Sequence, residues 1–127
     1  MENISYNFEE FTSFGSKFSP KISLGKTGGF GFSSGFCHRY NINDTASLKI
    51  YFDKSKNAVG FRFFDKIEDG TVKLKLGRTG GHLAARSFLG KYGIDPAKFS
   101  GRYDPKEITD GNAGKMYVIE LKERSGA

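Results

Sequence analysis

The sequence predicts a mainly β protein with short helices, of the α+β class, built from two tandem β-β-α-β-β repeats. The segment "KISLGKTGGFGFSSGFCHRYNIN" (Lys21–Asn43) aligns without a gap with "KLKLGRTGGHLAARSFLGKYGID" (Lys73–Asp95). In both copies, short stretches of alternating polar and apolar residues, typical of half-buried strands, flank a glycine-rich turn. We therefore divide the chain into an N-terminal segment (1–18), repeat 1 (19–64), a linker (65–70), repeat 2 (71–121) and a tail (122–127).

The identities between the two copies extend beyond the glycine turn. A tandem duplication explains a match of this length better than chance does. The identical pairs are Lys21/Lys73, Leu24/Leu76, Gly25/Gly77, Thr27/Thr79, Gly28/Gly80, Gly29/Gly81, Phe36/Phe88, Tyr40/Tyr92 and Ile42/Ile94.

In repeat 1 the elements are expected in a simple order. "KISL" and "FGF" form a hairpin around the turn "GKTGG", because glycine tolerates the positive φ that tight turns require. Phe36 and Tyr40 then stand four residues apart, which places both rings on one face of a short helix. A second hairpin, "SLKIYFD" and "AVGFRFF", follows and turns between Asp53 and Asn57.

Repeat 2 is expected to follow the same order. "VKLKL" and "HLA" form its first hairpin, and "ARSFLGKYGI" its helix, which Gly93 ends as Asn41 ends the first. Its closing hairpin is expected from "FSGRYD" and "KMYVIEL", joined by a longer loop around "PKEITDGNAG".

The turn "LGKTGG" does not predict a nucleotide site. A phosphate-binding P-loop has another glycine five residues before the Gly of Gly-Lys-Thr, where this chain has Pro20 in one copy and Val72 in the other. The lysine is also replaced in copy two, by Arg78. Because no catalytic constellation stands out either, we expect no enzyme activity, no cofactor and no small-molecule substrate.

The run "ISLGKTGGFGFSSGFCHRYNINDTASLKIYFDKSKNAVGFRFF" resembles the AbrB-like swapped-hairpin family, in its order of strand, basic glycine turn, strand, short helix and closing hairpin. The resemblance covers roughly Pro20–Phe64 and Thr71–Leu121. It implies a pseudo-two-fold swapped-hairpin barrel, formed by two copies within one chain, and a DNA-binding transcription regulator. The proline usual at the start of the family's helix is missing here.

The distribution of charge favours a polyanionic partner independently of that resemblance. The net charge is +6, and the windows 19–42 and 71–94 contain no Asp or Glu, although an even spread of the chain's 14 acidic residues would place about five there. A surface that meets phosphates gains from cations and loses from carboxylates. We therefore expect duplex DNA to contact the eight cations of these windows: Lys21, Lys26, Arg39, Lys73, Lys75, Arg78, Arg86 and Lys91.

Other interpretations of these patterns stay open. The two basic turns are also explained as solvated hairpin tips whose cations prevent edge aggregation. A protein-interaction or assembly module, acting as a homodimer or with another protein, would use a strand edge or the N-terminal segment, whose Phe8, Phe11, Phe14 and Phe18 suggest a short helix or an arm. Phe61, Arg62 and Phe63 would serve a binder of single-stranded nucleic acid.

Composition predicts a cytoplasmic protein. No apolar run approaches the roughly 18 residues of a membrane span, and the N-terminus lacks the features of a secretory signal. The single cysteine, Cys37, cannot form an internal disulfide and is expected to pack as a small hydrophobic residue. His38 and His82 have no metal-ligand spacing, so no metal site is expected.

Overall fold

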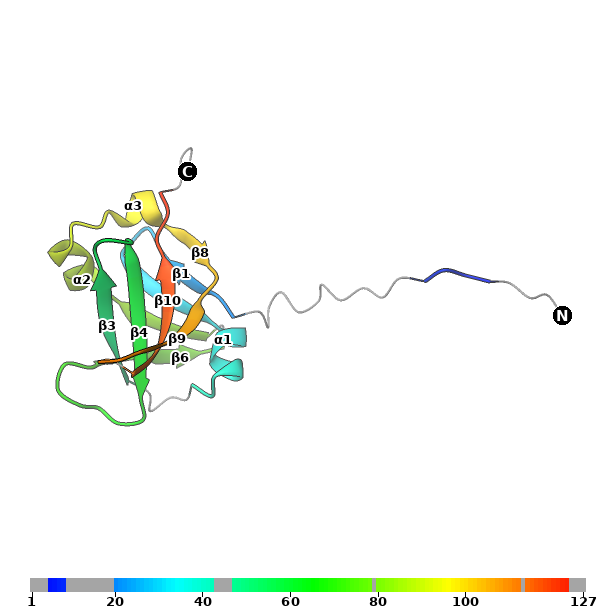
Figure 1. Ribbon diagram of the computed structural model, residues 1–127, viewed down its shortest axis with the longest axis horizontal. Helices are drawn as coiled ribbons and strands as arrows, with labels where there is room; N and C mark the ends of the chain where they lie inside the picture. The colour runs from blue at the N-terminus through cyan, green and yellow to red at the C-terminus, as the bar shows by residue number, and fades with distance from the viewer. Residues whose placement is uncertain (1–4, 9–19, 43–46, 79, 113, 124–127) are drawn as a thin grey trace.

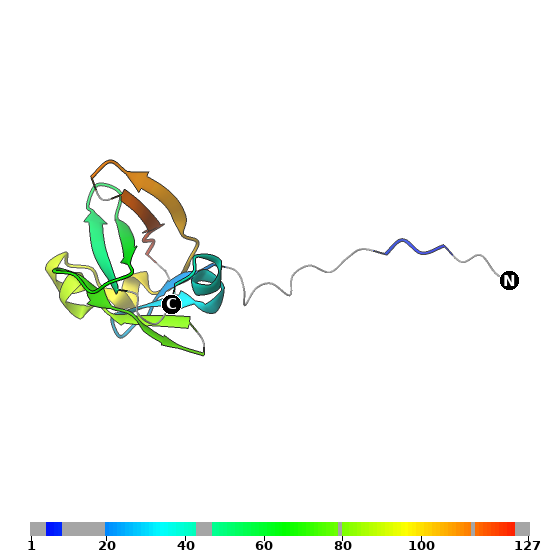
Figure 2. The same cartoon turned by 90° about the horizontal axis from the view of Figure 1, so that it is seen from below.

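The computed structural model describes residues 5–8, 20–42, 47–78, 80–112 and 114–123. The predicted class is confirmed: the described part of the chain is mainly β, with three short helices (Figure 1). Its strands form two five-stranded antiparallel sheets, which lie one above the other when the molecule is seen from below (Figure 2).

Sheet A has the strand order β6-β7-β2-β1-β8. Sheet B has the order β5-β3-β4-β10-β9. The strands of sheet A are β1 (Ile22–Leu24), β2 (Gly29–Ser33), β6 (Lys75–Gly77), β7 (Gly80–Ala84) and β8 (Gly101–Tyr103). Those of sheet B are β3 (Ser47–Asp53), β4 (Ala58–Phe64), β5 (Val72–Lys73), β9 (Lys106–Asp110) and β10 (Gly114–Glu120).

Each half of the chain contributes one hairpin to each sheet. The first half supplies β1–β2 and β3–β4, and the second supplies β6–β7 and β9–β10. At the centre of sheet A, β2 pairs with β7, with Phe30 opposite Leu83 and Gly31 opposite His82. In the alignment of the two repeats, Phe30 matches His82 and Gly31 matches Leu83. Replacing both members of one pair by the residues they match gives the other pair, so the register is the same for both repeats.

The expectation of a barrel is wrong, because the described strands form two open sheets. Besides the connection from β2 to β3, the chain passes between the sheets at two tight corners. Leu74 separates β5 from β6, and Asp104 with Pro105 separates β8 from β9. Proline has no N–H to donate to a ladder, so the pairing is interrupted at the second corner. These corners connect the sheets covalently without closing them by hydrogen bonds.

The closing hairpin predicted for repeat 2 is also wrong in one strand. The partner of β10 is β9, which lies within the stretch expected to be a loop, whereas β8, from "FSGRYD", pairs with β1 in sheet A. All five residues of β9 are exposed, so it lacks the buried alternate positions by which strands are predicted.

Aromatic side chains fill the space between the sheets. Phe30 and Phe32 of sheet A meet Phe61 of sheet B edge-on, with ring centroids 5.0 and 5.1 Å apart. Phe61 is fully buried, and Phe63 packs against the same cluster. The buried ring of Phe61 is therefore not accessible for stacking on single-stranded bases.

Two of the three helices lie where the sequence predicts them, and the third, which includes Phe99 of the predicted strand "FSGRYD", was not predicted. α1 (Ser34–Arg39) and α2 (Arg86–Lys91) occupy aligned positions 52 residues apart, and α3 (Pro96–Phe99) adds one short turn. No helix of the described residues is long and apolar enough to cross a membrane. The expected N-terminal helix at Phe11, Phe14 and Phe18 lies outside the described residues, and Ser5–Phe8 is not helical.

Candidate nucleic-acid interface

The outer face of sheet A is lined by small residues with cations at its two edges. One row of cross-strand neighbours runs across all five strands: Arg102, Ser23, Gly31, His82 and Lys75. Large apolar residues of the same strands, such as Phe30, point the other way into the core. This row is called the central row of sheet A.

A shallow hollow of about 180 Å³ lies over the central row from Arg102 to His82. Its lining includes Lys21, Ser23, Gly31, His82 and Arg102. A Cβ on Gly31 would lie 2.8 Å from the Ser23 Oγ, so the glycine allows the neighbouring hydroxyl to lie flat on the floor. A rod-like ligand could therefore approach the backbone of β2 closely.

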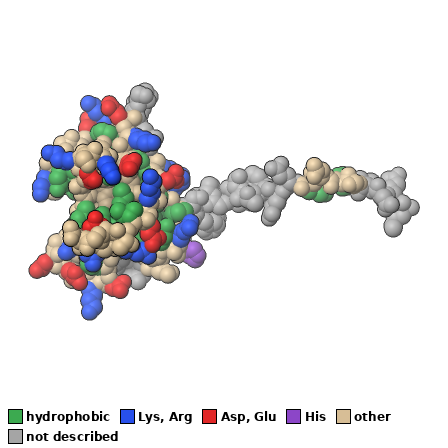
Figure 3. Space-filling view, viewed as in Figure 1, with side chains coloured by type: hydrophobic (Ala, Val, Ile, Leu, Met, Phe, Trp, Pro, Cys, Tyr) green, Lys and Arg blue, Asp and Glu red, His purple; other side chains and the backbone are tan. Residues whose placement is uncertain are grey.

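Charge is distributed unequally between the two sheets. The strands of sheet A contain no Asp or Glu, and carry Lys75, Arg102 and His82. The strands of sheet B contain four acidic and five basic residues, and side chains of both kinds appear on its face in Figure 3. An anionic ligand is therefore favoured electrostatically at sheet A rather than at sheet B.

The first basic turn joins β1 to β2 and presents Lys26. Two hydrogen bonds hold it: Gly25 N–H donates to the Gly29 carbonyl (2.9 Å) and Gly28 N–H donates to the Gly25 carbonyl (3.0 Å). The Nε of Arg86, at the start of α2, donates to the Thr27 carbonyl at 3.1 Å. Residues from both repeats thus place two exposed cations, Lys26 and Arg86, at one turn.

The second basic turn joins β6 to β7 and presents the exposed Arg78. Its Gly80 has φ +120°, and a Cβ there would collide with the carbonyl oxygen of Phe32. The turn therefore lies tightly against the junction of β2 and α1. Since β2 and β7 are antiparallel and each follows one of the turns, the two turns lie at opposite ends of the β2–β7 ladder. The five paired positions of this ladder span about 13 Å along the strands.

The structure places five of the eight predicted cations around sheet A: Lys21, Lys26, Lys75, Arg78 and Arg86. Lys21 is half-buried and forms an ion pair with Asp104 beside β8, whereas the other seven are exposed. Of the remaining three, Lys73 lies on β5 of sheet B, next to the corner that leads to β6.

Arg39 and Lys91 have a different setting. They occupy the last turns of α1 and α2, where cations interact favourably with the helix dipole. Each also lies over the ring of the following tyrosine, at 5.9 Å for Arg39 and 5.4 Å for Lys91. Their presence in both repeats is therefore accounted for by the helices, without a ligand.

Sequence reasoning missed Arg102 and His82 as members of this surface. Arg102 lies outside the acid-free windows, and the sequence predicts its strand as part of the closing hairpin of repeat 2. His82 has no metal-ligand spacing in the sequence, and among the described residues no three His, Cys, Asp or Glu side chains are grouped to hold a metal ion. Alignment of His82 with Phe30, a buried strand residue of copy one, gave no sign that His82 would face outward.

Comparison of the chain with protein-family models, with curated proteins and with solved structures found no match.

Proposed function

We propose that the chain binds duplex DNA through the outer face of sheet A and its two basic turns, and that it acts as a transcription regulator. The observation that carries this proposal is the absence of carboxylates from the strands of sheet A, while cations stand at both turns and on the central row. Phosphate contacts supply most of the sequence-independent affinity of a DNA-binding protein.

A duplex is favoured over single-stranded nucleic acid by the chemistry of this face. Single-strand binders stack bases on exposed aromatic rings. The outward positions of β1, β2 and β7 hold Ser23, Gly31, His82 and Ala84, whereas Phe30 and Phe32 are buried. Small residues flanked by cations suit close contact with a phosphate backbone.

The AbrB-like resemblance belongs to this proposal as well. Members of that family interleave hairpins from two chains, and here each half of one chain sends its first hairpin to sheet A and its second to sheet B. The symmetric register of β2 and β7 supports two copies related by a pseudo-two-fold axis. The basic turns would then be equivalent contacts at either end of the interface.

The proposal is tested by titrating the full chain into labelled random duplex DNA at several salt concentrations. The logarithm of the binding constant falls with the logarithm of the salt concentration, with a slope of about −0.9 for each phosphate contacted. If the five cations around sheet A and Arg102 each contact one phosphate, the slope is roughly −5. The double variant Lys26→Glu/Arg78→Glu is expected to lose most of this binding while circular dichroism shows an unchanged fold.

The matched control reverses two charges on the other sheet. Lys54 and Lys56 lie in the exposed turn between β3 and β4, so Lys54→Glu/Lys56→Glu changes the net charge equally. This control should reduce affinity much less than the sheet A variant does. Equal losses in the two variants would mean that net charge alone drives binding, and binding that survives Lys26→Glu/Arg78→Glu would exclude the turns as the contact.

A further inference from the structure

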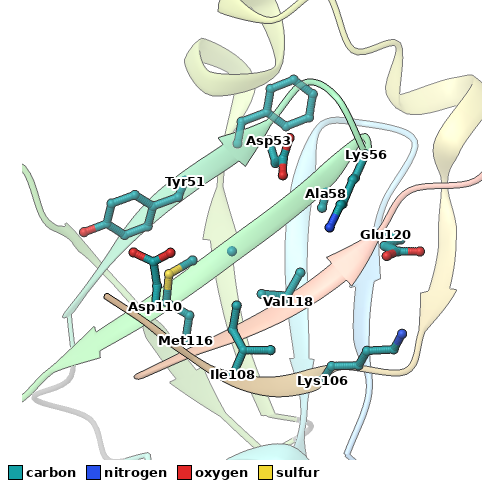
Figure 4. A pocket seen from close by; sticks show the side chains of 12 residues that line it. Tyr51, Asp53, Lys56, Ala58, Lys106, Ile108, Asp110, Met116, Val118 and Glu120 are labelled. Carbon is teal, nitrogen blue, oxygen red and sulfur yellow. The ribbon is translucent and has the colours of Figure 1, made fainter. Parts of the chain in front are cut away.

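The outer face of sheet B carries an apolar groove, visible as hydrophobic side chains in the middle of the face in Figure 3. Its volume is about 330 Å³, and its apolar lining comes from four strands: Tyr51, Ala58, Ile108, Met116 and Val118 (Figure 4). These five residues define the sheet B groove. Charged side chains, among them Lys56, Lys106 and Asp110, stand around it.

The floor of the sheet B groove is built around Gly60. Tyr51, Gly60 and Val118 are cross-strand neighbours on β3, β4 and β10. A Cβ on Gly60 would collide with the Met116 Cε, so the missing side chain lets Met116 lie down over the sheet. Methionine is flexible and polarisable and makes favourable contacts with aromatic rings. The floor therefore suits an aromatic ligand.

One side of the groove is an open strand edge. β9 pairs with β10 and is the last strand in the order of sheet B. Ile108, at its middle, points into the groove and is 41% exposed. An edge strand offers backbone N–H and C=O groups to an added strand, whose alternate side chains then enter neighbouring pockets.

The chain carries a segment that matches this edge. Tyr6 and Phe8 are 65% and 87% exposed, and their rings contact each other with centroids 5.2 Å apart. Because they are two residues apart, an extended backbone directs both rings to the same side. A cavity of 150 Å³ holds one benzene, so the volume of the sheet B groove admits both rings.

The tether between segment and groove is long enough for docking within one chain. Lys21 pairs with Asp104, and β9 begins two residues after Asp104, so the start of β1 lies beside the start of β9. The twelve residue steps from Phe8 to Pro20 span up to about 40 Å. A short tether gives an effective concentration in the millimolar range, which favours the chain's own groove over that of a second copy.

We propose that the N-terminal segment Ser5–Phe8 docks along β9 as an added strand, with Tyr6 and Phe8 in the sheet B groove of its own chain. This contact covers the exposed apolar surface of both parts. It lies on the face opposite the candidate DNA interface, and is independent of DNA binding.

NMR of the isotope-labelled full chain tests the contact. Ring-to-methyl NOEs are expected from Tyr6 and Phe8 to Ile108, Met116 and Val118, and they should be unchanged on tenfold dilution while sedimentation shows a monomer. Tyr6→Ser/Phe8→Ser should abolish them and shift the groove methyl resonances. Ile67→Ser removes a side chain that is 70% exposed elsewhere and should leave those resonances in place.

Three outcomes would overturn the proposal. If no such NOEs are seen, or if the double substitution leaves the methyl resonances of the groove unmoved, the segment does not dock there. If the NOEs weaken on dilution together with loss of a dimer, the occupant is the segment of a second copy. Since residues 5–8 lie outside both sheets, the double variant folds whichever result is obtained.

Discussion

Asn41 and Gly93, 52 residues apart, end α1 and α2 in the same left-handed conformation, with φ of 55° and 65°. In both cases the residue after the left-handed one closes the helix: Ile42 N–H donates to the Cys37 carbonyl, and Ile94 N–H donates to the Leu89 carbonyl, each at 2.9 Å. This is the Schellman arrangement. One copy builds it with glycine and the other with asparagine, the two residues that tolerate this conformation best.

The two helix ends predict opposite responses to substitution. Gly93→Ala adds a Cβ to a left-handed residue and should lower the free energy of unfolding by about 1 kcal/mol. Asn41→Gly removes that same strain and should leave the free energy of unfolding unchanged or raise it by roughly a few tenths of a kcal/mol. Urea unfolding followed by circular dichroism measures both. Equal effects of the same sign in the two variants would contradict the assignment of both residues to this cap.

Gly80 is predicted to be the more sensitive glycine of repeat 2. Gly80→Ala combines a φ of +120° with a collision against backbone atoms at the end of β2, which cannot move independently of sheet A. We expect a loss of at least about 2 kcal/mol in the free energy of unfolding. Gly90→Ala is the matched control, since an added Cβ on this residue of α2 meets nothing within 4 Å. It should stabilise the protein by about 0.5–1 kcal/mol.

Local patterns in the sequence predict the elements but not all of their partners. Helices α1 and α2 follow from aromatic spacing and from the residues that end them, which are properties of neighbouring positions. The pairing of β8 with β1 joins Tyr103 to Ile22 across 81 residues, and no local pattern encodes it. β9 escaped prediction because Ile108 is its only apolar residue, so its exposed strand resembles a loop.

The same distinction applies to the candidate site. Absence of acidic residues is a local property, and the two acid-free windows contain the strands β1, β2, β6 and β7 of sheet A, together with the helices α1 and α2 and the strand β5 of sheet B. Arg102 joins them only through the non-local pairing of β8. Lys91 shares the acid-free window, but it lies in the last turn of α2 and over the ring of Tyr92.

Tyr117 predicts a loss of stability at alkaline pH. Burial raises the pKa of its phenol above the ordinary value of 10.0, and Lys115 opposes this shift. As the pH rises through 10, the unfolded chain releases this proton while the folded chain retains it, so the free energy of unfolding falls. Tyr117→Phe should make that fall shallower. Identical slopes in the wild-type protein and in Tyr117→Phe would refute the prediction.

Cys37 is predicted to react slowly with alkylating agents in the folded protein. It lies half-buried on α1, its Sγ 4.0 Å from the Phe32 carbonyl, and burial raises the pKa of its thiol. Only the thiolate is a good nucleophile, so near neutral pH both a low ionised fraction and limited access slow the reaction. We expect modification by iodoacetamide to be several-fold slower than that of free glutathione at the same pH, and to approach the glutathione rate in denaturing urea. A folded-state rate equal to that of glutathione would show that the thiol is ionised and open to solvent, contrary to its place between α1 and β2.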